Sequence, residues 1–328
     1  MVLFWVSVLA FGILLYVLLD GFDLGVGILF GFSRIEDRRR AMMRSVAPVW
    51  DGNETWLVVS GVVLWGAFPI VYATLFSAFY LPLIFMLAGL ILRGIAFEFR
   101  DKALHLRMVW GLGFCAGSLV AAFMQGVMVG ALIEGLPLIH GQYAGSDFSW
   151  LSPFAVLCGA GLCLGYSLLG ACWLVRKCDG ETQSWAYRLI AELSVALALL
   201  LVVVFVLALA LNLRVMGRWL ERPYLFVFPV IGVATATVLA WSVRRRHVRA
   251  PGYAVAASFA AAFATLAITF WPYMVPFSIT VGQAAAPHAS LAFMFWGEGL
   301  FILPLMLAYT FIGYRVFRGR DETTSISY

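Results

Sequence analysis

Charged residues are scarce in this 328-residue sequence: Asp, Glu, Lys and Arg make up 12%, whereas hydrophobic residues make up 63%. A soluble domain carries about 25% charged residues, which keep its surface in contact with water. The chain therefore lacks the polar material to cover a water-exposed globule. This shortage excludes a soluble enzyme or binding domain and predicts that the lipid bilayer surrounds most of the surface.

Histidine and cysteine are also scarce. The four histidines, His105, His140, His247 and His288, fall in predicted loops or at the end of a predicted span. A membrane haem protein with two histidine ligands needs them on facing helices, so a haem held wholly within this chain is not expected. The five cysteines show neither a disulfide framework nor a metal-binding spacing, and no metal site is predicted.

Long apolar segments occupy most of the sequence. A membrane-spanning helix needs about 20 mostly apolar residues, and this length predicts nine spans: 2–31, 54–74, 76–97, 109–133, 151–175, 185–212, 224–243, 253–275 and 289–315. The first span lacks the basic flank and cleavage site of a signal peptide, so we expect a retained helix. The fold class is all-α, a polytopic membrane protein. Residues 1–328 are expected to form one membrane domain, with sub-bundles at 1–135 and 151–275 and a last helix at 289–315.

Basic residues are distributed unevenly between the predicted loops. With the N-terminus outside, on the periplasmic side, 18 Lys and Arg lie on the cytoplasmic side and only Arg214, Arg218 and Arg222 lie opposite. Cytoplasmic loops carry an excess of Lys and Arg, so we predict a periplasmic N-terminus and a cytoplasmic C-terminus. This bias accounts for the basic sequence pI of about 9.0, and no nucleic-acid partner is predicted.

Two carboxylates interrupt the first predicted span. An ionisable group in hydrocarbon costs roughly 3 to 10 kcal/mol, so each one retained there is a candidate functional residue. Asp20 and Asp23 have a spacing that places them on one helical face. The four-residue spacing of the glycines, Gly21 with Gly25 and Gly27 with Gly31, favours close helix approach. The alternative is that one Asp caps a broken helix.

A second polar group opens the second predicted span. Asp51, Asn53 and Glu54 lie between two tryptophans just before a strongly apolar run. Asp51 or Asn53 alone would serve as an N-cap, but a cap needs one such residue and this segment has three. We therefore favour a proton-conducting or polar-cofactor role for Asp51 or Glu54.

The third predicted span carries Arg93 about one turn inside its cytoplasmic boundary. Its partner is expected to be Glu98, or an Asp or Glu of the first two spans. Glu98 lies close enough to the interface for its side chain to reach water instead. Further along, Glu298 is predicted either to relay protons or to contact a partner subunit.

These polar segments carry a family resemblance. The order, spacing and nine-span layout resemble subunit II of the cytochrome bd family of quinol oxidases over essentially the whole chain, in residues 20–27 (DGFDLGVG), 48–56 (PVWDGNETW), 93–100 (RGIAFEFR) and 271–276 (WPYMVP). The Trp-Asp-Gly-Asn element is the most specific of these. The short loops are closer to the cyanide-insensitive branch of the family.

The resemblance implies a heterodimer in the bacterial cytoplasmic membrane that oxidises quinol and reduces oxygen to water. Subunit I would carry the haems of b and d type and the quinol site. This chain would pack against it, with small single-helix subunits and with lipid or a structural quinone. The resemblance assigns a cytoplasmic proton route to the polar residues, Asp51, Glu54, Asp20, Asp23, Arg93 and Glu98, and an oxygen path to Trp56. Glu54 departs from family members with Gln at this position, which makes its role the least defined.

Two rival functions remain at this point. Intramembrane Asp residues beside glycines resemble the broken helices of a proton-coupled secondary transporter. Against this, the charged cluster occurs only in the first half of the chain. The other rival is a purely structural membrane subunit whose carboxylates stabilise a partner and conduct no protons.

Overall fold

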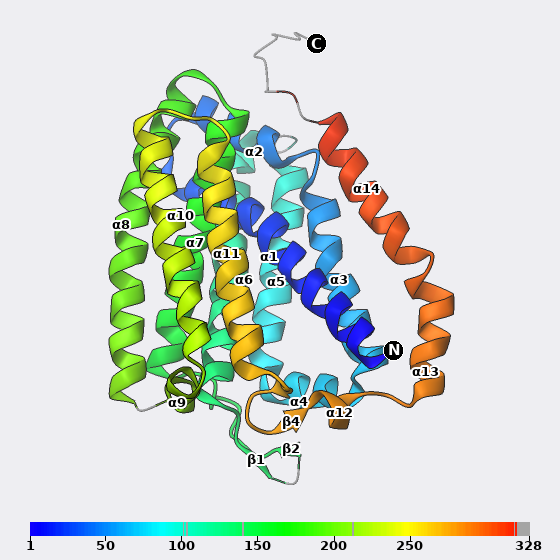
Figure 1. The fold of residues 1–328 in the computed structure, drawn as a ribbon. Helices are drawn as coiled ribbons and strands as arrows, with labels where there is room; N and C mark the ends of the chain where they lie inside the picture. The colour runs from blue at the N-terminus through cyan, green and yellow to red at the C-terminus, as the bar shows by residue number, and fades with distance from the viewer. Residues whose placement is uncertain (101, 103, 140, 212, 318, 320–328) are drawn as a thin grey trace.

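Helices, most of them long, make up most of the protein (Figure 1). The computed structural model describes residues 1–317 and 319, apart from 101, 103, 140 and 212, so His140, Arg318 and Arg320 lie outside the described residues. The longer helices are α1 (Val2–Phe32), α2 (Glu36–Val46), α3 (Trp50–Ala67), α4 (Pro69–Ala78), α5 (Tyr80–Phe99), α6 (Arg107–Glu134), α7 (Pro153–Lys177), α8 (Gly180–Ala210), α10 (Val227–Arg244), α11 (Ala250–Phe270) and α14 (Ile302–Val316). Shorter ones are η1 (Leu104–Leu106), α9 (Arg214–Glu221), η2 (Pro223–Phe226), α12 (Val281–Ala284), α13 (His288–Met294) and η3 (Phe295–Gly299).

The described chain has eight helices long and apolar enough to cross a membrane, or nine if the bent pair α3 and α4 forms one span. This confirms an all-α polytopic membrane protein. Helix α1 begins near the end of the bundle that carries α4 and α12, and α14 ends at the opposite end (Figure 1). Opposite ends fit an odd number of spans, while the side of the membrane on which each end lies stays a prediction.

The predicted second span, 54–74, is wrong in its boundaries. The chain bends by 119° between α3 and α4, so the first helix ends at Ala67 and α4 lies across the end of the bundle (Figure 1). Pro69, the first residue of α4, has no backbone N–H, and proline disfavours helical geometry in the residue before it. Phe68 accordingly leaves the helical region, with φ −137° and ψ 58°.

Two small hairpins close the same end of the bundle. Strands β1 (Leu138–Ile139) and β2 (Gln142–Tyr143) pair within the segment after α6. Strands β3 (Tyr273–Val275) and β4 (Ile279–Thr280) pair just after α11. Both are antiparallel.

Helix α1 runs diagonally through the bundle (Figure 1) and packs against α3, α6 and α7. Its second half is buried from Asp20 to Phe30. A methyl group on Gly25 would overlap the backbone carbonyl of Tyr166, and one on Gly27 would overlap the Ser118 side chain. These contacts confirm the predicted close approach at the glycines and place the two Asp residues in the protein interior.

The last helical segment, α13 to α14, stands at the side of the bundle (Figure 1), and α14 has no buried residue. A few contacts hold it to α1 and α3. Trp5 Nε1 donates to the Leu291 carbonyl over 3.1 Å, and Met294 lies against Gly66. Apolar side chains along the segment are widely exposed, with Phe293 at 80%.

Candidate functional site

Arg93 forms the centre of a buried ionic cluster. Its Nη1 atom donates to Asp20 Oδ1 and its Nη2 atom donates to Glu54 Oε2, each over 2.7 Å. Helix α5 therefore binds α1 and α3 through one guanidinium. The side chains of Arg93 and Asp20 are 3% and 0% exposed, and that of Glu54 is 27% exposed. The structure confirms the alternative in which Arg93 pairs with the first two predicted spans.

Asp23 belongs to a second, adjacent network. Asn53 Nδ2 donates to Asp23 Oδ2 over 2.7 Å and to the Leu19 carbonyl over 3.3 Å, and Tyr314 of α14 donates to Asn53 Oδ1 over 2.9 Å. Asn53 is therefore not an N-cap; the N-cap of α3 is Val49, without a side-chain hydrogen bond. The sequence marked Asn53 only as a candidate cap and gave no signal for Tyr314, because a tyrosine near the end of an apolar helix is common at membrane interfaces.

Asp51 and Glu54 lie in the first turns of α3. Asp51 is exposed, whereas Glu54 lies partly inside and contacts Arg93. Side-chain exposure thus decreases from Asp51 through Glu54 to Asp20. This order places a series of carboxylates between the surface beside α2 and the protein interior.

Glu98 lies apart from this cluster. Its exposed side chain pairs with Lys102 over 3.5 Å, one helical turn away. The pairing of Glu98 with Arg93 that the sequence left open is therefore not formed. The neighbouring Arg100 is 1% exposed, and its Nη2 atom donates to both carboxylate oxygens of Glu36 over 2.8 and 2.9 Å. This ion pair fastens α2 to the end of α5.

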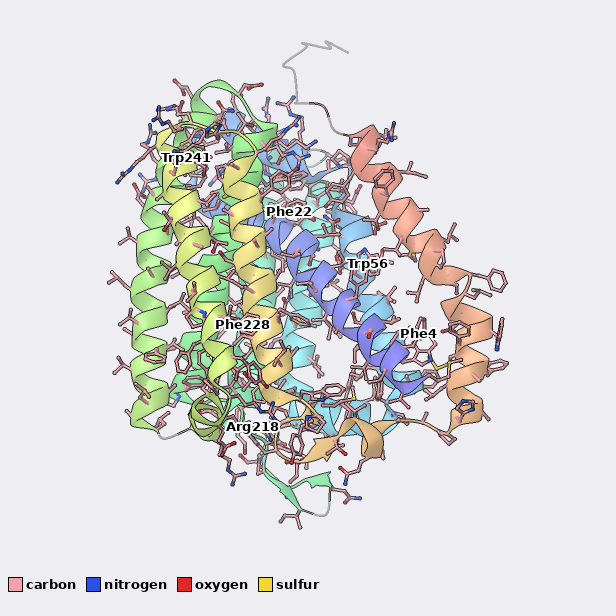
Figure 2. All side chains as sticks on the ribbon, viewed as in Figure 1. Phe4, Phe22, Trp56, Arg218, Phe228 and Trp241 are labelled. Carbon is pink, nitrogen blue, oxygen red and sulfur yellow. The ribbon has the colours of Figure 1, made fainter. Side chains whose placement is uncertain are left out.

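Trp56 is 1% exposed, and its Nε1 atom donates to Thr310 Oγ1 of α14 over 3.2 Å. Its ring lines a groove of about 480 Å³ between α1, α3 and α14, with apolar walls that include Phe4, Phe11 and Leu307. Figure 2 shows Trp56 and Phe4 beside the gap between α1 and α14.

A third polar group, which the sequence did not predict, extends deeper. Tyr166 donates to Gln125 Oε1 over 2.9 Å, and Gln125 Nε2 donates to the Tyr16 hydroxyl over 2.8 Å. Of the three residues, only Gln125 stands out in the sequence, as an amide inside the predicted span 109–133. Tyr16 lies one helical turn before Asp20, on the same face of α1. This spacing marks Tyr16 as a member of the polar group only when it is known that this face of α1 points inward.

The histidines and the remaining carboxylates lie away from this site. His105 and His247 lie between the spans, and His288 is the first residue of α13. Within the described residues no group of three or more His, Cys, Asp or Glu is placed to hold a metal ion. Glu192 and Glu298 are both exposed on the outer face of their helices.

The sequence matches the family "Cytochrome bd terminal oxidase subunit II" over residues 1–317. The chain belongs to this family. It is 30% identical to a Haemophilus influenzae protein named "Probable cytochrome oxidase subunit 2", covering 94% of this chain and 91% of that protein. It is also 30% identical to the "Cytochrome bd-I ubiquinol oxidase subunit 2" of Escherichia coli K12, covering 91% and 90%.

The fold agrees with this assignment. The structure of bd oxidase from Geobacillus thermodenitrificans contains a chain that matches with a TM-score of 0.79 at 17% identity, covering 96% of this chain and 98% of that one. As a second subunit of a cytochrome bd-type terminal oxidase, the protein is a multi-pass membrane component of an oxidoreductase complex. The similarities give no support to the secondary-transporter alternative.

Proposed function

We propose that the protein pairs with a haem-bearing subunit I in the bacterial cytoplasmic membrane, with its N-terminus outside, and delivers protons and oxygen to that subunit. The haems, of b and d type, supply the electron transfer and oxygen reduction in the partner. Quinol is the reductant of the complex, and small single-helix subunits complete it. Oxygen reduction consumes protons taken from the cytoplasm, while quinol oxidation releases quinol protons outside, and together these two steps create a charge difference across the membrane without pumping.

The main support for the proposed proton route is the decrease in side-chain exposure from Asp51 through Glu54 to Asp20. Asp51 lies in the first turn of α3, which follows α2 in the sequence, and the arginines of α2 are among those that predict the cytoplasmic side. Figure 2 shows nitrogen-tipped side chains gathered at that end, whereas Arg218 lies at the opposite one. An exposed carboxylate collects a proton, and a half-buried one beside Arg93 passes it inward.

Arg93 has an electrostatic role in this route. A guanidinium stays protonated and cannot relay the proton itself, but it gives both Asp20 and Glu54 a charged hydrogen-bond partner in the interior. It also fixes both carboxylates within one hydrogen-bond length of the same group. Glu98, which is exposed and pairs with Lys102, would act only at the protein surface, where the route begins.

The groove beside Trp56 supports an oxygen path. Dioxygen is apolar and partitions into hydrocarbon, so an apolar passage from the bilayer serves it better than a hydrated one. The lining residues are apolar apart from Ser7, and Trp56 stands at its inner wall. The path would run between α1 and α14 toward the partner.

A larger apolar groove supports a bound quinone or lipid. It measures about 600 Å³, lies between α8, α10 and α11, and Figure 2 labels Phe228 on its wall. Thr269 is one of its lining residues, and the Thr269 hydroxyl is buried without a hydrogen-bond partner. A carbonyl of a quinone or of a lipid ester would accept a hydrogen bond from Thr269 while the chain fills the groove.

The experiment is the oxygen consumption of the purified complex carrying Asp51→Asn or Glu54→Gln. Each change keeps the shape and removes a protonatable group, so we expect slower turnover with haem content unchanged in the visible spectrum. Glu181→Gln, at the exposed start of α8, is the matched control. Full turnover in both test variants would leave the structural-subunit role as the function of this chain.

A further inference from the structure

Three arginines gather at the end of the bundle opposite α2 (Figure 1). Arg214 and Arg218 lie in α9 and Arg222 directly follows it, so this arginine cluster has one member at every fourth position. Figure 2 labels Arg218 at this end, below Phe228 of α10. The predicted orientation puts the cluster outside, where membrane proteins carry fewer Lys and Arg. Its presence on that side therefore calls for a physical reason.

The protein itself uses the arginine cluster only in part. Arg218 Nη1 donates to the carbonyls of Thr269 and Trp271 over 3.0 and 3.2 Å. Arg222 Nη1 donates to the carbonyls of Ile268 and Trp271 over 3.2 and 3.4 Å. These bonds satisfy carbonyls at the C-terminal end of α11. Arg218 and Arg222 are only half-buried, so their Nε and Nη2 atoms remain as donors for an acceptor from outside the chain.

No carboxylate balances this charge in the part of the chain that the structure describes. Neither Glu221, the carboxylate of α9, nor any other described acidic residue forms an ion pair with the arginine cluster. Arg214 and Arg218 instead lie over one ring, that of Phe277, with 5.9 and 5.4 Å between guanidinium carbon and ring centroid. Like charges held so close repel one another, and a bound anion would relieve the repulsion.

The arginine cluster stands at one end of the apolar groove of about 600 Å³. Trp219, the neighbour of Arg218, lines the groove, and so does Thr269, whose carbonyl Arg218 binds. Helix α9 also packs against α11, which forms one wall. From Thr269 the groove follows α11 to Val255, about 21 Å at 1.5 Å per residue. One half of the hydrocarbon core measures about 15 Å, so the groove accepts a whole lipid chain from this end.

The middle of the groove offers hydrocarbon rather than hydrogen-bond donors. Its hydroxyl groups, on Ser194, Ser258 and Thr265, each donate to a carbonyl of their own helix. A quinone head group binds through carbonyls that need donors, and these three hydroxyls have already used theirs. An acyl chain needs no donor, and its phosphate stays at the interface. The lining and the arginine cluster thus fit the two parts of one amphiphile.

We propose that the groove binds an anionic phospholipid of the outer leaflet, with an acyl chain along α11 and the phosphate on the arginine cluster. The phosphate accepts from Arg218 and Arg222, because a guanidinium and a phosphate pair through parallel hydrogen bonds. Arg214 adds a positive charge at the surface. The inference rests on the proposed function only in treating the groove as a ligand site, and it narrows the ligand to a charged lipid.

The first test compares the affinity of the purified complex for two lipids by native mass spectrometry and by the shift in melting temperature. The probes are phosphatidylglycerol, which is anionic, and phosphatidylcholine with the same chains. We expect phosphatidylglycerol to bind roughly tenfold more tightly and inorganic phosphate to give no stabilisation at the same concentration. Equal affinity for the two lipids overturns the role of the arginine cluster. Stabilisation by inorganic phosphate alone would assign the cluster to a free anion.

The second test removes a charge without removing a hydrogen bond. Arg214 makes no hydrogen bond within the described residues, so Arg214→Gln leaves the end of α11 intact. Arg244→Gln, at an exposed arginine of the opposite end of α10, is the matched control. We expect an affinity for phosphatidylglycerol about fivefold lower in Arg214→Gln alone. An affinity equal to that of the control overturns the proposal.

The third test blocks the groove without changing a charge. Ala262→Phe places a ring among the lining residues, and Ala257→Phe, at an exposed position of α11 outside the lining, is the control. We expect the complex to retain less phosphatidylglycerol in Ala262→Phe alone. Loss of a bound quinone there, with the lipid unchanged, would overturn the lipid assignment. Failure of the proposed function is a different result, because it shows as full turnover in Asp51→Asn and Glu54→Gln.

Discussion

Arg93 Nη1 lies 2.7 Å from Asp20 Oδ1, in a contact between α5 and α1 with 3% and 0% of the two side chains exposed. The same guanidinium binds Glu54 of α3 over the same distance. One buried cation thus unites three helices. The charge of Arg93 is shared between a carboxylate sealed in the interior and one that reaches toward the surface.

This asymmetry predicts unequal effects on stability. Asp20→Asn leaves the buried guanidinium with one carboxylate, and breaking a buried ion pair costs about 3 to 5 kcal/mol. Glu54→Gln affects a side chain with 27% exposure, so water offsets part of the loss. We expect a larger fall in the melting temperature of the purified complex for Asp20→Asn than for Glu54→Gln. The reverse order would show that the Glu54 contact is the stronger one.

The hydrogen bonds of the Asn53 amide predict that Asn53→Ala lowers stability more than Tyr314→Phe does. Asn53→Ala removes two hydrogen bonds, the one donated to Asp23 and the one accepted from Tyr314, at about 1 kcal/mol each. Tyr314→Phe removes one neutral bond, at about 1 kcal/mol. Thermal unfolding of both single variants and of the double variant measures the coupling. A double variant with the summed effects of the singles would show that the two residues do not interact.

The sequence predicted which polar residues gather but not how they pair. Asp20, Asp23, Glu54 and Arg93 stood out because charge is costly in hydrocarbon, and they lie in two adjacent networks, Arg93 with Asp20 and Glu54, and Asp23 with Asn53. The role of Asn53 depended on the rotation of α3 relative to α1. The spacing of residues along one helix does not determine how that helix is rotated relative to another. Tyr314 and Thr310, from the far end of the chain, were beyond prediction because α14 reaches α3 only through tertiary packing.

The same reasoning explains the bend after α3. Hydropathy continues through residue 74, so the apolar run alone favoured one helix across Pro69. The loss of one backbone donor and the restriction on Phe68 outweighed that continuity. Apolar length predicts that a segment avoids water, whereas local backbone chemistry decides where a helix ends.

A pH dependence follows from Glu36, which lies in α2 outside the spans. Burial raises the pKa of Glu36, but the hydrogen bonds and charge of Arg100, with the charges of Arg107 and Arg40, outweigh it, so the net pKa lies below its ordinary value. A carboxylate with a lowered folded-state pKa stabilises the protein above its unfolded pKa of about 4.3. This stabilisation is lost as the pH falls through the folded-state pKa.

We therefore expect Glu36→Gln to lower the melting temperature at neutral pH and to have little effect below the folded-state pKa of Glu36. The effect is expected to be below about 1 kcal/mol because Glu36 is 37% exposed and exposed pairs are screened. High salt should reduce the difference further. Melting curves against pH, at low and high salt, measure both effects. A difference that persists unchanged at acidic pH would assign the effect of Glu36 to packing.

Trp56 yields a prediction for oxygen affinity. Trp56→Phe removes part of the ring that forms the inner wall of the groove between α1 and α14 and also the bond to Thr310. A wider apolar passage speeds the arrival of oxygen without altering the chemistry in the partner, so we expect a few-fold lower apparent KM for oxygen with kcat unchanged. Trp65→Phe, on the same helix with Trp65 65% exposed, makes the same chemical change away from the groove. The measurement is turnover of both complexes as a function of oxygen concentration. Equal KM values would place the oxygen path outside this groove. A fall in kcat for Trp56→Phe alone would show that the ring supports the partner's haem site through packing.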